Sequence, residues 1–154
     1  MSACVPVPCD AAARARLVAL ARGWIGTPYR HRASLRGVGC DCLGLILGVM
    51  RDWQGCAPAR LPPYTPAWDE IAPREALWQG LSRHLAERAP ASTWLPGQVV
   101  LFRMRSASVA KHLGLLSMVG PGARFIHAYG RHGTIESPLS GPWRARVVAR
   151  FELI

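Results

Sequence analysis

The stretch Asp41-Cys42-Leu43-Gly44-Leu45-Ile46-Leu47-Gly48-Val49-Met50-Arg51-Asp52-Trp53 decides how the rest of the chain is arranged. Apolar residues fill it almost without interruption, and a run of this length without a turn signal favours a buried helix over a buried strand. Asp41 belongs to the residue types that cap the first turn of a helix, so the helix is predicted to begin just after it. The remaining elements must therefore cover this helix on most sides.

Two further helices are expected in the first half of the chain. Over residues 10–24, apolar residues recur with helical spacing behind an aspartate that can cap the first turn. Residues 57–66 hold four prolines, which forbid a regular helix, and a loop is expected there. Over residues 68–88, apolar side chains fall broadly on one side of a helix.

The pattern changes after Pro96-Gly97, where short apolar runs alternate with Gly and Pro turns. Such runs are typical of strands. The predicted strands are residues 99–102, 112–119, 124–129, 133–136 and 146–153. Helices first and a meander of strands second predict an α+β fold, and the length of the chain fits one domain over residues 1–154.

The chain is strongly basic, with a formal net charge of +10 over 154 residues, and Lys111 is its only lysine among 19 cations. The arginines are scattered, and no aromatic RNA-binding signature or zinc-finger spacing accompanies them, so specific nucleic-acid recognition is not expected. Positive charge favours anionic partners such as a bacterial envelope. A solvated basic surface is the simpler explanation of the same composition.

The sequence also carries expectations about compartment and cofactors. Asp10, Arg14 and Arg16 interrupt the region where a secretory signal needs an apolar run, and no later run reaches transmembrane length. Synthesis in the bacterial cytoplasm without Sec export is therefore expected. Five cysteines are an odd number, and Cys40 and Cys42 lie too close for an ordinary structural bridge. No pair has CxxC spacing, and we expect no metal and no other cofactor.

Cys42 lies at the predicted start of the buried helix, where a thiol is suited to act as a nucleophile. The positive end of a helix and a nearby imidazolium both stabilise a thiolate, so a pKa below the usual value of about 8.5 is expected. The backbone N–H of Cys42 would help to hold an oxyanion. The small Gly44 would let substrate or backbone come close. An inert buried cysteine is the alternative.

His112 and His127 interrupt two apolar runs on either side of Gly120-Pro121-Gly122, which predicts a hairpin. If the hairpin loop has an even number of residues, positions that differ by an odd number share one face, and these two differ by fifteen. A bulge near the turn would reverse the parity. On a shared face, His127 would orient the ring of His112, which would take the proton of Cys42 and return it to a leaving amine. Two structural histidines are the alternative.

Four short motifs, in this order and spacing, resemble the NlpC family of papain-like cell-wall cysteine peptidases. They are Gly26-Thr27-Pro28-Tyr29, Asp41-Cys42-Leu43-Gly44, His112-Leu113-Gly114 and Phe125-Ile126-His127-Ala128, and the likeness covers roughly residues 15–150. The resemblance implies N-terminal helices, with the nucleophile at a helix N-terminus, packed on a C-terminal antiparallel β-sheet. It implies Cys42 as nucleophile, His112 as general base and acid, and His127 as the group orienting it. Tyr29 and Asp41 would contact the substrate or the oxyanion.

Residues 24–52 and 127–143, with Glu136-Ser137-Pro138-Leu139-Ser140, resemble more narrowly the peptidases encoded among tail genes of phages and gene transfer agents. This implies a thiol protease and peptidoglycan hydrolase in the tail of a phage-like particle, acting at the target cell wall beside other tail proteins. The implied reaction is hydrolysis of stem-peptide amide bonds, typically between D-glutamate and a diamino acid, through a thioester. Leu43 and Arg30-His31-Arg32 depart from the family pattern, where serine and a glycine pair are common.

Two other functions fit the same residues. One is a catalytically silent structural or wall-binding tail component with a peptidase-like fold, which the complete Cys-His-His set argues against. The other is a transferase, in which an amine or a lipid replaces water as the acceptor of the acyl group. Product analysis separates hydrolysis from transfer, because only hydrolysis leaves a free carboxylate.

Overall fold

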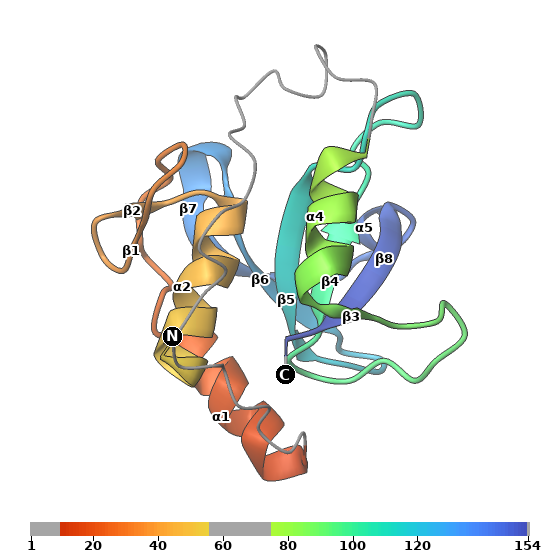
Figure 1. The fold of residues 1–154 in the computed structure, drawn as a ribbon, viewed down its shortest axis with the longest axis horizontal. Coiled ribbons are helices and arrows are strands. Elements are labelled where there is room, and N and C mark those ends of the chain that lie inside the picture. The colour runs from red at the N-terminus through yellow and green to blue at the C-terminus, as the bar shows by residue number, and fades with distance from the viewer. Residues whose placement is uncertain (1–9, 56–74, 154) are drawn as a thin grey trace.

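Figure 1 shows the fold in a computed structural model, which describes residues 10–55 and 75–153. Helices come first and an antiparallel sheet follows, as the α+β prediction requires. The elements in chain order are α1 (Ala11–Arg22), β1 (Ser34–Leu35), β2 (Gly39–Cys40), α2 (Cys42–Gln54), α4 (Ala76–His84), β3 (Ala86–Glu87), β4 (Val99–Phe102), β5 (His112–Met118), β6 (Arg124–Tyr129), a 3-10 turn (Gly130–His132), β7 (Gly133–Pro138), α5 (Gly141–Arg144) and β8 (Val147–Glu152).

The main sheet has six strands in the order β3-β8-β4-β5-β6-β7, and every neighbouring pair is antiparallel. The strands β4, β5, β6 and β7 therefore follow one another as a meander, while β8 returns to pair with β4. β1 and β2 form a separate two-stranded hairpin immediately before α2. The five predicted strands are all present, whereas β1, β2, β3 and the short helix α5 were not predicted from the sequence.

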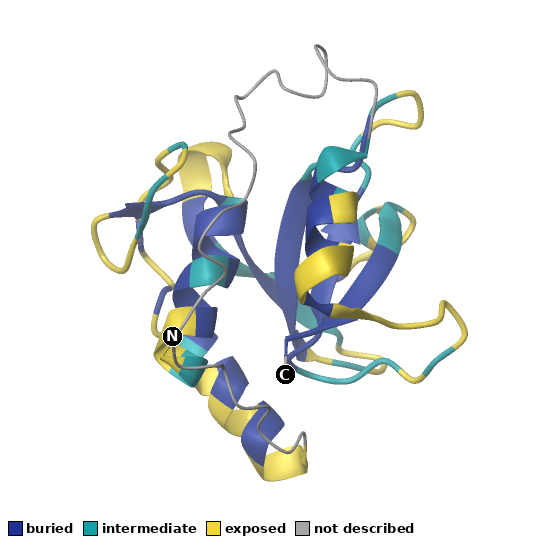
Figure 2. Cartoon of the chain, in the orientation of Figure 1, coloured by how far each residue is buried: buried dark blue, intermediate teal, exposed yellow. Residues whose placement is uncertain are grey.

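The two faces of the sheet are covered differently, because successive side chains of a strand point to opposite faces. Val99 and Leu101 of β4 join an aliphatic core with residues of α1, α2 and α4. Val100 and Phe102 join a second cluster with Phe125 and other residues on the opposite face. Figure 2 shows the central strands and the inner sides of α1 and α2 largely buried, with most exposed residues in the turns and on the outer helix surfaces.

Each of the first two helices begins with a capping aspartate, as predicted. The side chain of Asp10 accepts a hydrogen bond from Ala13 N at 2.7 Å, and Asp41 accepts one from Gly44 N at 2.7 Å. These bonds satisfy backbone donors that have no partner within the first turn. α2 ends at Gln54 and is capped by Gly55, whose φ of +71° is the left-handed conformation in which a helix commonly terminates. None of the described helices is both long and apolar enough to span a lipid bilayer.

The helix predicted over residues 68–88 is wrong at its C-terminal end. α4 ends at His84, Leu85 is extended, and the next two residues pair with β8 as the edge strand β3. Glu87 accepts hydrogen bonds from Trp78 and Ser82 on α4, so the helix and the strand are tied together across a sharp change of direction. Pairing with β8 thus replaces the last helical turn. Residues 68–74 and the predicted loop over residues 57–66 lie outside the described residues.

Candidate active site

Cys42 is the first residue of α2 and lies against the start of β5. Its Sγ donates a hydrogen bond to the carbonyl oxygen of Lys111 at 3.6 Å, and the backbone of Leu113 also hydrogen-bonds the sulfur. These two residues flank His112. The thiol is partly buried, and so the predicted nucleophile touches the backbone on both sides of the predicted base.

Asp41 fixes the chain that leads into this helix. Its Oδ1 accepts the Gly44 N–H, its Oδ2 accepts the Arg32 N–H at 2.6 Å, and Nδ1 of His31 lies 3.8 Å from the same Oδ2. The side chain is buried, with only 1% of the residue exposed. Asp41 therefore holds the 31–33 loop against the helix start. Its role toward a substrate stays a prediction.

Gly44 makes the close approach of this loop possible. A Cβ at this position would lie 1.8 Å from the carbonyl oxygen of Ala33, a distance at which no side chain fits. The hydroxyl of Ser34 donates a hydrogen bond to the Gly44 carbonyl at 2.5 Å. The sequence suggested that either substrate or backbone would come close to Gly44. The structure places the backbone of Ala33 there.

The prediction of a low-pKa thiol at Cys42 is wrong for the resting protein. Burial and, second to it, the adjacent Asp41 carboxylate raise the pKa of Cys42 to about 12, although hydrogen bonds from the backbone of Leu113, Leu43 and Cys42 act in the opposite direction. The cap that starts the helix is thus an anion next to the sulfur, and it offsets the positive end of the helix. The resting sulfur is a neutral thiol.

His112 and His127 lie on the same face of the sheet and are joined directly. Nε2 of His112 is 2.8 Å from Nδ1 of His127. The register pairs Leu115 with Ile126, so His127 sits opposite Gly114 and diagonally across from His112. Diagonal neighbours on adjacent strands are within reach of ring side chains. The predicted same-face placement is confirmed.

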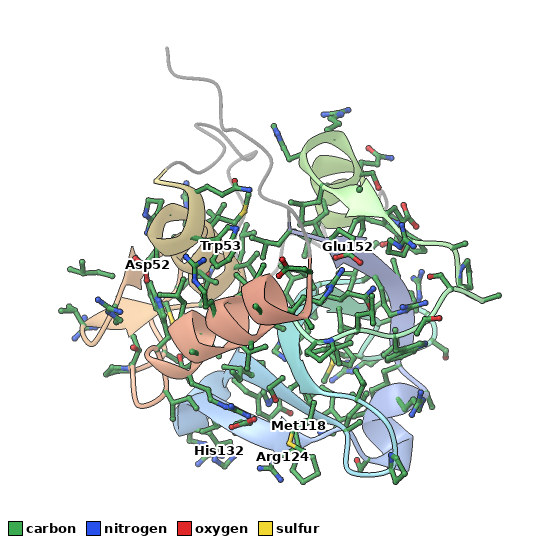
Figure 3. The ribbon with its side chains drawn as sticks, turned by 90° about the horizontal axis from the view of Figure 1, so that it is seen from below. Asp52, Trp53, Met118, Arg124, His132 and Glu152 are labelled. Atoms are coloured by element: carbon green, nitrogen blue, oxygen red, sulfur yellow. The ribbon has the colours of Figure 1, made fainter. Side chains whose placement is uncertain are left out.

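The reason for this placement differs from the one the sequence suggested. Met118 pairs with Arg124, both labelled in Figure 3, which leaves five residues in the turn, an odd number. Leu116 pairs with Phe125, so Ser117 is an extra residue on β5, a bulge. An odd turn and one bulge each reverse the parity, and together they restore it. Hydrogen bonding of Ser117 Oγ to Glu136 at 2.6 Å anchors the bulge.

Both imidazoles are buried, with 7% of His112 and 1% of His127 exposed. Burial, with the neighbouring His127 as the second cause, lowers the pKa of His112 to about 3. Burial likewise lowers the pKa of His127 to about 4, with His132 as the second cause. At neutral pH both rings are therefore neutral, which leaves each with one protonated and one unprotonated nitrogen. A neutral His112 is able to accept a proton.

Aromatic side chains surround the histidine pair. The indole of Trp143 on α5 lies with its centroid 5.6 Å from His112 and 5.2 Å from His127. Tyr129 stacks on His127 at 5.4 Å and meets the edge of His112 at 5.5 Å. Phe102 lies 5.7 Å from His112. These rings exclude water from the pair. Their place at the site could not be predicted from the sequence, because strand register and the helix α5 bring them together.

Tyr29 pairs with Cys40, just before the start of α2. Its neighbours Pro28 and Arg30 hydrogen-bond the backbone of Cys40, two residues before the nucleophile. Burial, followed by the neighbouring Cys42 and Asp41, raises the pKa of the Tyr29 phenol to about 12. The phenol therefore keeps its proton and remains a hydrogen-bond donor close to the sulfur.

The other cysteine near the site is fully buried. Sγ of Cys40 lies 3.2 Å from Oγ1 of Thr134, and both Cys40 and Cys42 are free thiols. Within residues 10–55 and 75–153, no group of three or more His, Cys, Asp or Glu side chains is arranged to hold a metal ion. Cys4, Cys9 and Cys56 lie outside the described residues.

No protein-family model matches the sequence, and no curated protein matches it. The fold matches solved structures of the NlpC/P60 family. A lipoprotein-like NLP/P60 protein from Staphylococcus aureus is 19% identical, with a TM-score of 0.64 over 99% of this chain and 45% of that one. The NlpC/p60 domain of the peptidoglycan hydrolase SagA is 18% identical, with a TM-score of 0.56 over 90% of this chain and 97% of that domain.

A third match, NlpC2 from Trichomonas vaginalis, is 18% identical, with a TM-score of 0.64 over 99% of this chain and 50% of that one. The chain thus spans less than half the length of the S. aureus protein and half that of NlpC2. At this low sequence identity, the structural likeness shows the fold alone. The chain has the α+β fold of the NlpC/P60 proteins, with N-terminal helices packed on an antiparallel sheet, as the resemblance implied.

Proposed function

We propose that the protein is a cysteine peptidase that hydrolyses amide bonds in the stem peptides of bacterial peptidoglycan. The observation that carries the proposal is the meeting of a helix-start thiol, Cys42, with a strand whose first residue, His112, is hydrogen-bonded to His127. A thiol nucleophile, a neutral imidazole at the start of the strand whose backbone the thiol contacts, and a group that orients this imidazole are the parts that covalent catalysis needs. The NlpC/P60 fold supports the same class of substrate.

The reaction follows from the neutral state of both groups. As the Cys42 sulfur attacks the carbonyl carbon, its proton passes to Nδ1 of His112, the nitrogen that the contact with His127 does not use. The tetrahedral intermediate collapses when His112 returns this proton to the departing amine, leaving a thioester. Water then gives a proton to His112 and its oxygen attacks the thioester, and the sulfur leaves as the thiol with a carboxylic acid as product.

The developing oxyanion needs donors that are already in place. The protonated phenol of Tyr29 and the backbone N–H of Cys42 at the first helical position are the two donors that we assign to it. The side chain of Leu43 is apolar and buried, so it offers no hydrogen bond to a peptide amine. We propose the D-glutamyl–diamino acid bond as the scissile bond, with fewer polar contacts at the amine side than a serine at this position would give.

We also propose that the enzyme works in the tail of a phage-like particle, at the wall of the target cell and among other tail proteins. The sequence resemblance of residues 24–52 and 127–143 to tail-encoded peptidases supports this placement. The net charge of +10 also favours an anionic envelope.

Digestion of purified Gram-negative peptidoglycan by the wild type and by Cys42→Ala, with mass spectrometry of the fragments, tests the activity. Cys40→Ala, which removes the neighbouring thiol, is the matched control. We expect new stem-peptide carboxylates from the wild type and from Cys40→Ala, and none from Cys42→Ala. Equal fragments from all three proteins would reject Cys42 as nucleophile, and products joined to an added amine would identify a transferase instead.

A further inference from the structure

Ser137 on β7 continues the line of hydrogen bonds that begins at His112. Its Oγ lies 3.0 Å from Nε2 of His127, the ring nitrogen opposite the one that contacts His112. β7 pairs with β6 so that Ile135 is opposite His127 and Ser137 is two residues further along. Ser137 is therefore a diagonal neighbour of His127, just as His127 is of His112. The line crosses three adjacent strands.

The direction of these hydrogen bonds decides whether His112 can act as a base. Each neutral ring has one N–H, and the short contact between the rings needs one donor and one acceptor. If His127 donated from Nδ1, Nε2 of His112 would be the acceptor and the His112 proton would sit on Nδ1, the nitrogen that must receive the thiol proton. If His112 donates from Nε2, its Nδ1 is free to accept. Only the second direction gives a base.

The second direction requires the proton of His127 to be on Nε2, facing Ser137. The buried N–H then needs an acceptor, because an unsatisfied buried donor is costly. The Ser137 hydroxyl is the group that the structure provides there, and Ser137 is itself partly exposed, so its own proton has access to water. The aromatic rings of Trp143 and Tyr129 cover the rest of the histidine pair.

We propose that Ser137 is a positioning residue that fixes the tautomer of the histidine pair by accepting the hydrogen bond of His127 Nε2–H. This inference rests on the proposed peptidase function, in which His112 takes the proton of Cys42. Ser137 acts through the two rings and does not touch the substrate.

The test combines kinetics with nuclear magnetic resonance of the ring nitrogens. In wild-type protein with ¹⁵N-labelled histidine, long-range ¹H–¹⁵N spectra are expected to show both His112 and His127 protonated at Nε2. Ser137→Ala should mix the two tautomers of His127 and lower kcat about tenfold with KM unchanged, since His127 Nε2–H loses its acceptor and no longer holds His112 in the tautomer that accepts a proton. Ser137→Thr, which keeps the hydroxyl, should restore most of kcat and the wild-type tautomer. Ser140→Ala, at an exposed serine whose side chain makes no capping bond, is the matched control.

Two results would overturn the inference. One is a wild-type protein in which His127 carries its proton on Nδ1, and the other is a Ser137→Ala variant with wild-type kcat and an unchanged tautomer. The spectra need no substrate, so they separate this inference from the proposed function. If the wild type cleaves no peptidoglycan but the His127 tautomer still depends on Ser137, the tautomer assignment stands and the peptidase function fails.

Discussion

The two halves of the site are held by different kinds of interaction. The nucleophile is placed by contacts between residues close in sequence, above all the bond from Gly44 N to Asp41, which spans three residues. The base His112 and its orienting partner His127 are placed by the pairing of two strands, and fifteen residues separate them in the sequence. The electrostatics differ as well: an anionic cap adjoins the thiol, whereas neutral aromatic rings enclose the histidines. A local contact depends on few residues, while strand register depends on the whole hairpin, including its bulge.

The largest effect is expected from removing the base on the strand side. His112→Ala should lower kcat/KM for peptidoglycan fragments by about a thousandfold, because a positioned general base typically contributes a factor of this order. His84→Ala, which removes an exposed imidazole at the end of α4, is the matched control and should stay close to the wild type. The rate at which soluble fragments are released from peptidoglycan measures the activity of both variants. Equal activity of the two variants would mean that the buried pair takes no part in the reaction.

The histidine half should also make the protein sensitive to acid. The pKa of His112 is lowered to about 3 and that of His127 to about 4, whereas both are about 6.5 when unfolded. Below pH 6.5 the unfolded chain binds more protons than the folded one, so stability is full above this pH and falls as the pH drops toward 4. The slope approaches about 1.4 kcal/mol per pH unit for each histidine. Unfolding midpoints in denaturant between pH 4.5 and 7.5 measure it, and His127→Asn should flatten the curve. An unchanged slope in that variant would contradict the neutral, buried pair.

The nucleophile half offers a matched pair of helix caps. Asp41→Ala removes acceptors from Gly44 N and Arg32 N in a buried place and should cost about 2–4 kcal/mol of unfolding free energy. Asp10→Ala removes one exposed cap from α1 and should cost about 1 kcal/mol. Urea unfolding compares them. Equal losses would show that the second hydrogen bond and the burial of Asp41 contribute nothing.

The smallest effect concerns the reactivity of the free thiol. With its pKa raised to about 12, Cys42 should be alkylated by iodoacetamide at least about tenfold more slowly at pH 8 than glutathione, with a rate that still rises beyond pH 10. Asp41→Asn should raise the rate, because it removes the second cause of the shift. Mass spectrometry of the Cys42 peptide follows the reaction. An alkylation rate that levels off between pH 6 and 8 would contradict the raised pKa and support the low-pKa thiolate predicted from the sequence.

Where the sequence carried a local signal, the prediction of structure succeeded. The start of α2 behind Asp41 and the strands β4 and β6 were predicted with their observed limits or within a residue, because capping and alternation act over a few neighbours. The end of α4 was wrong, since pairing of residues 86 and 87 with β8 competes with the helix and is not visible locally. The prediction of a low pKa for Cys42 was wrong for a similar reason, because the effect of burial on the thiolate outweighed that of the helix N-terminus.

By itself, the sequence determined the α+β order of elements and the position of Cys42 at a helix start, and it marked His112 and His127 as candidate partners. The tertiary structure alone decided what surrounds them: the bulge at Ser117 that restores the parity, the aromatic cover from Trp143, and Ser137 at the end of the hydrogen-bonded line. The physical reason is the distance along the chain over which each interaction acts. Caps and periodicity are set by neighbours along the chain, whereas register, burial and the direction of a proton are set by residues that meet only when the sheet has formed.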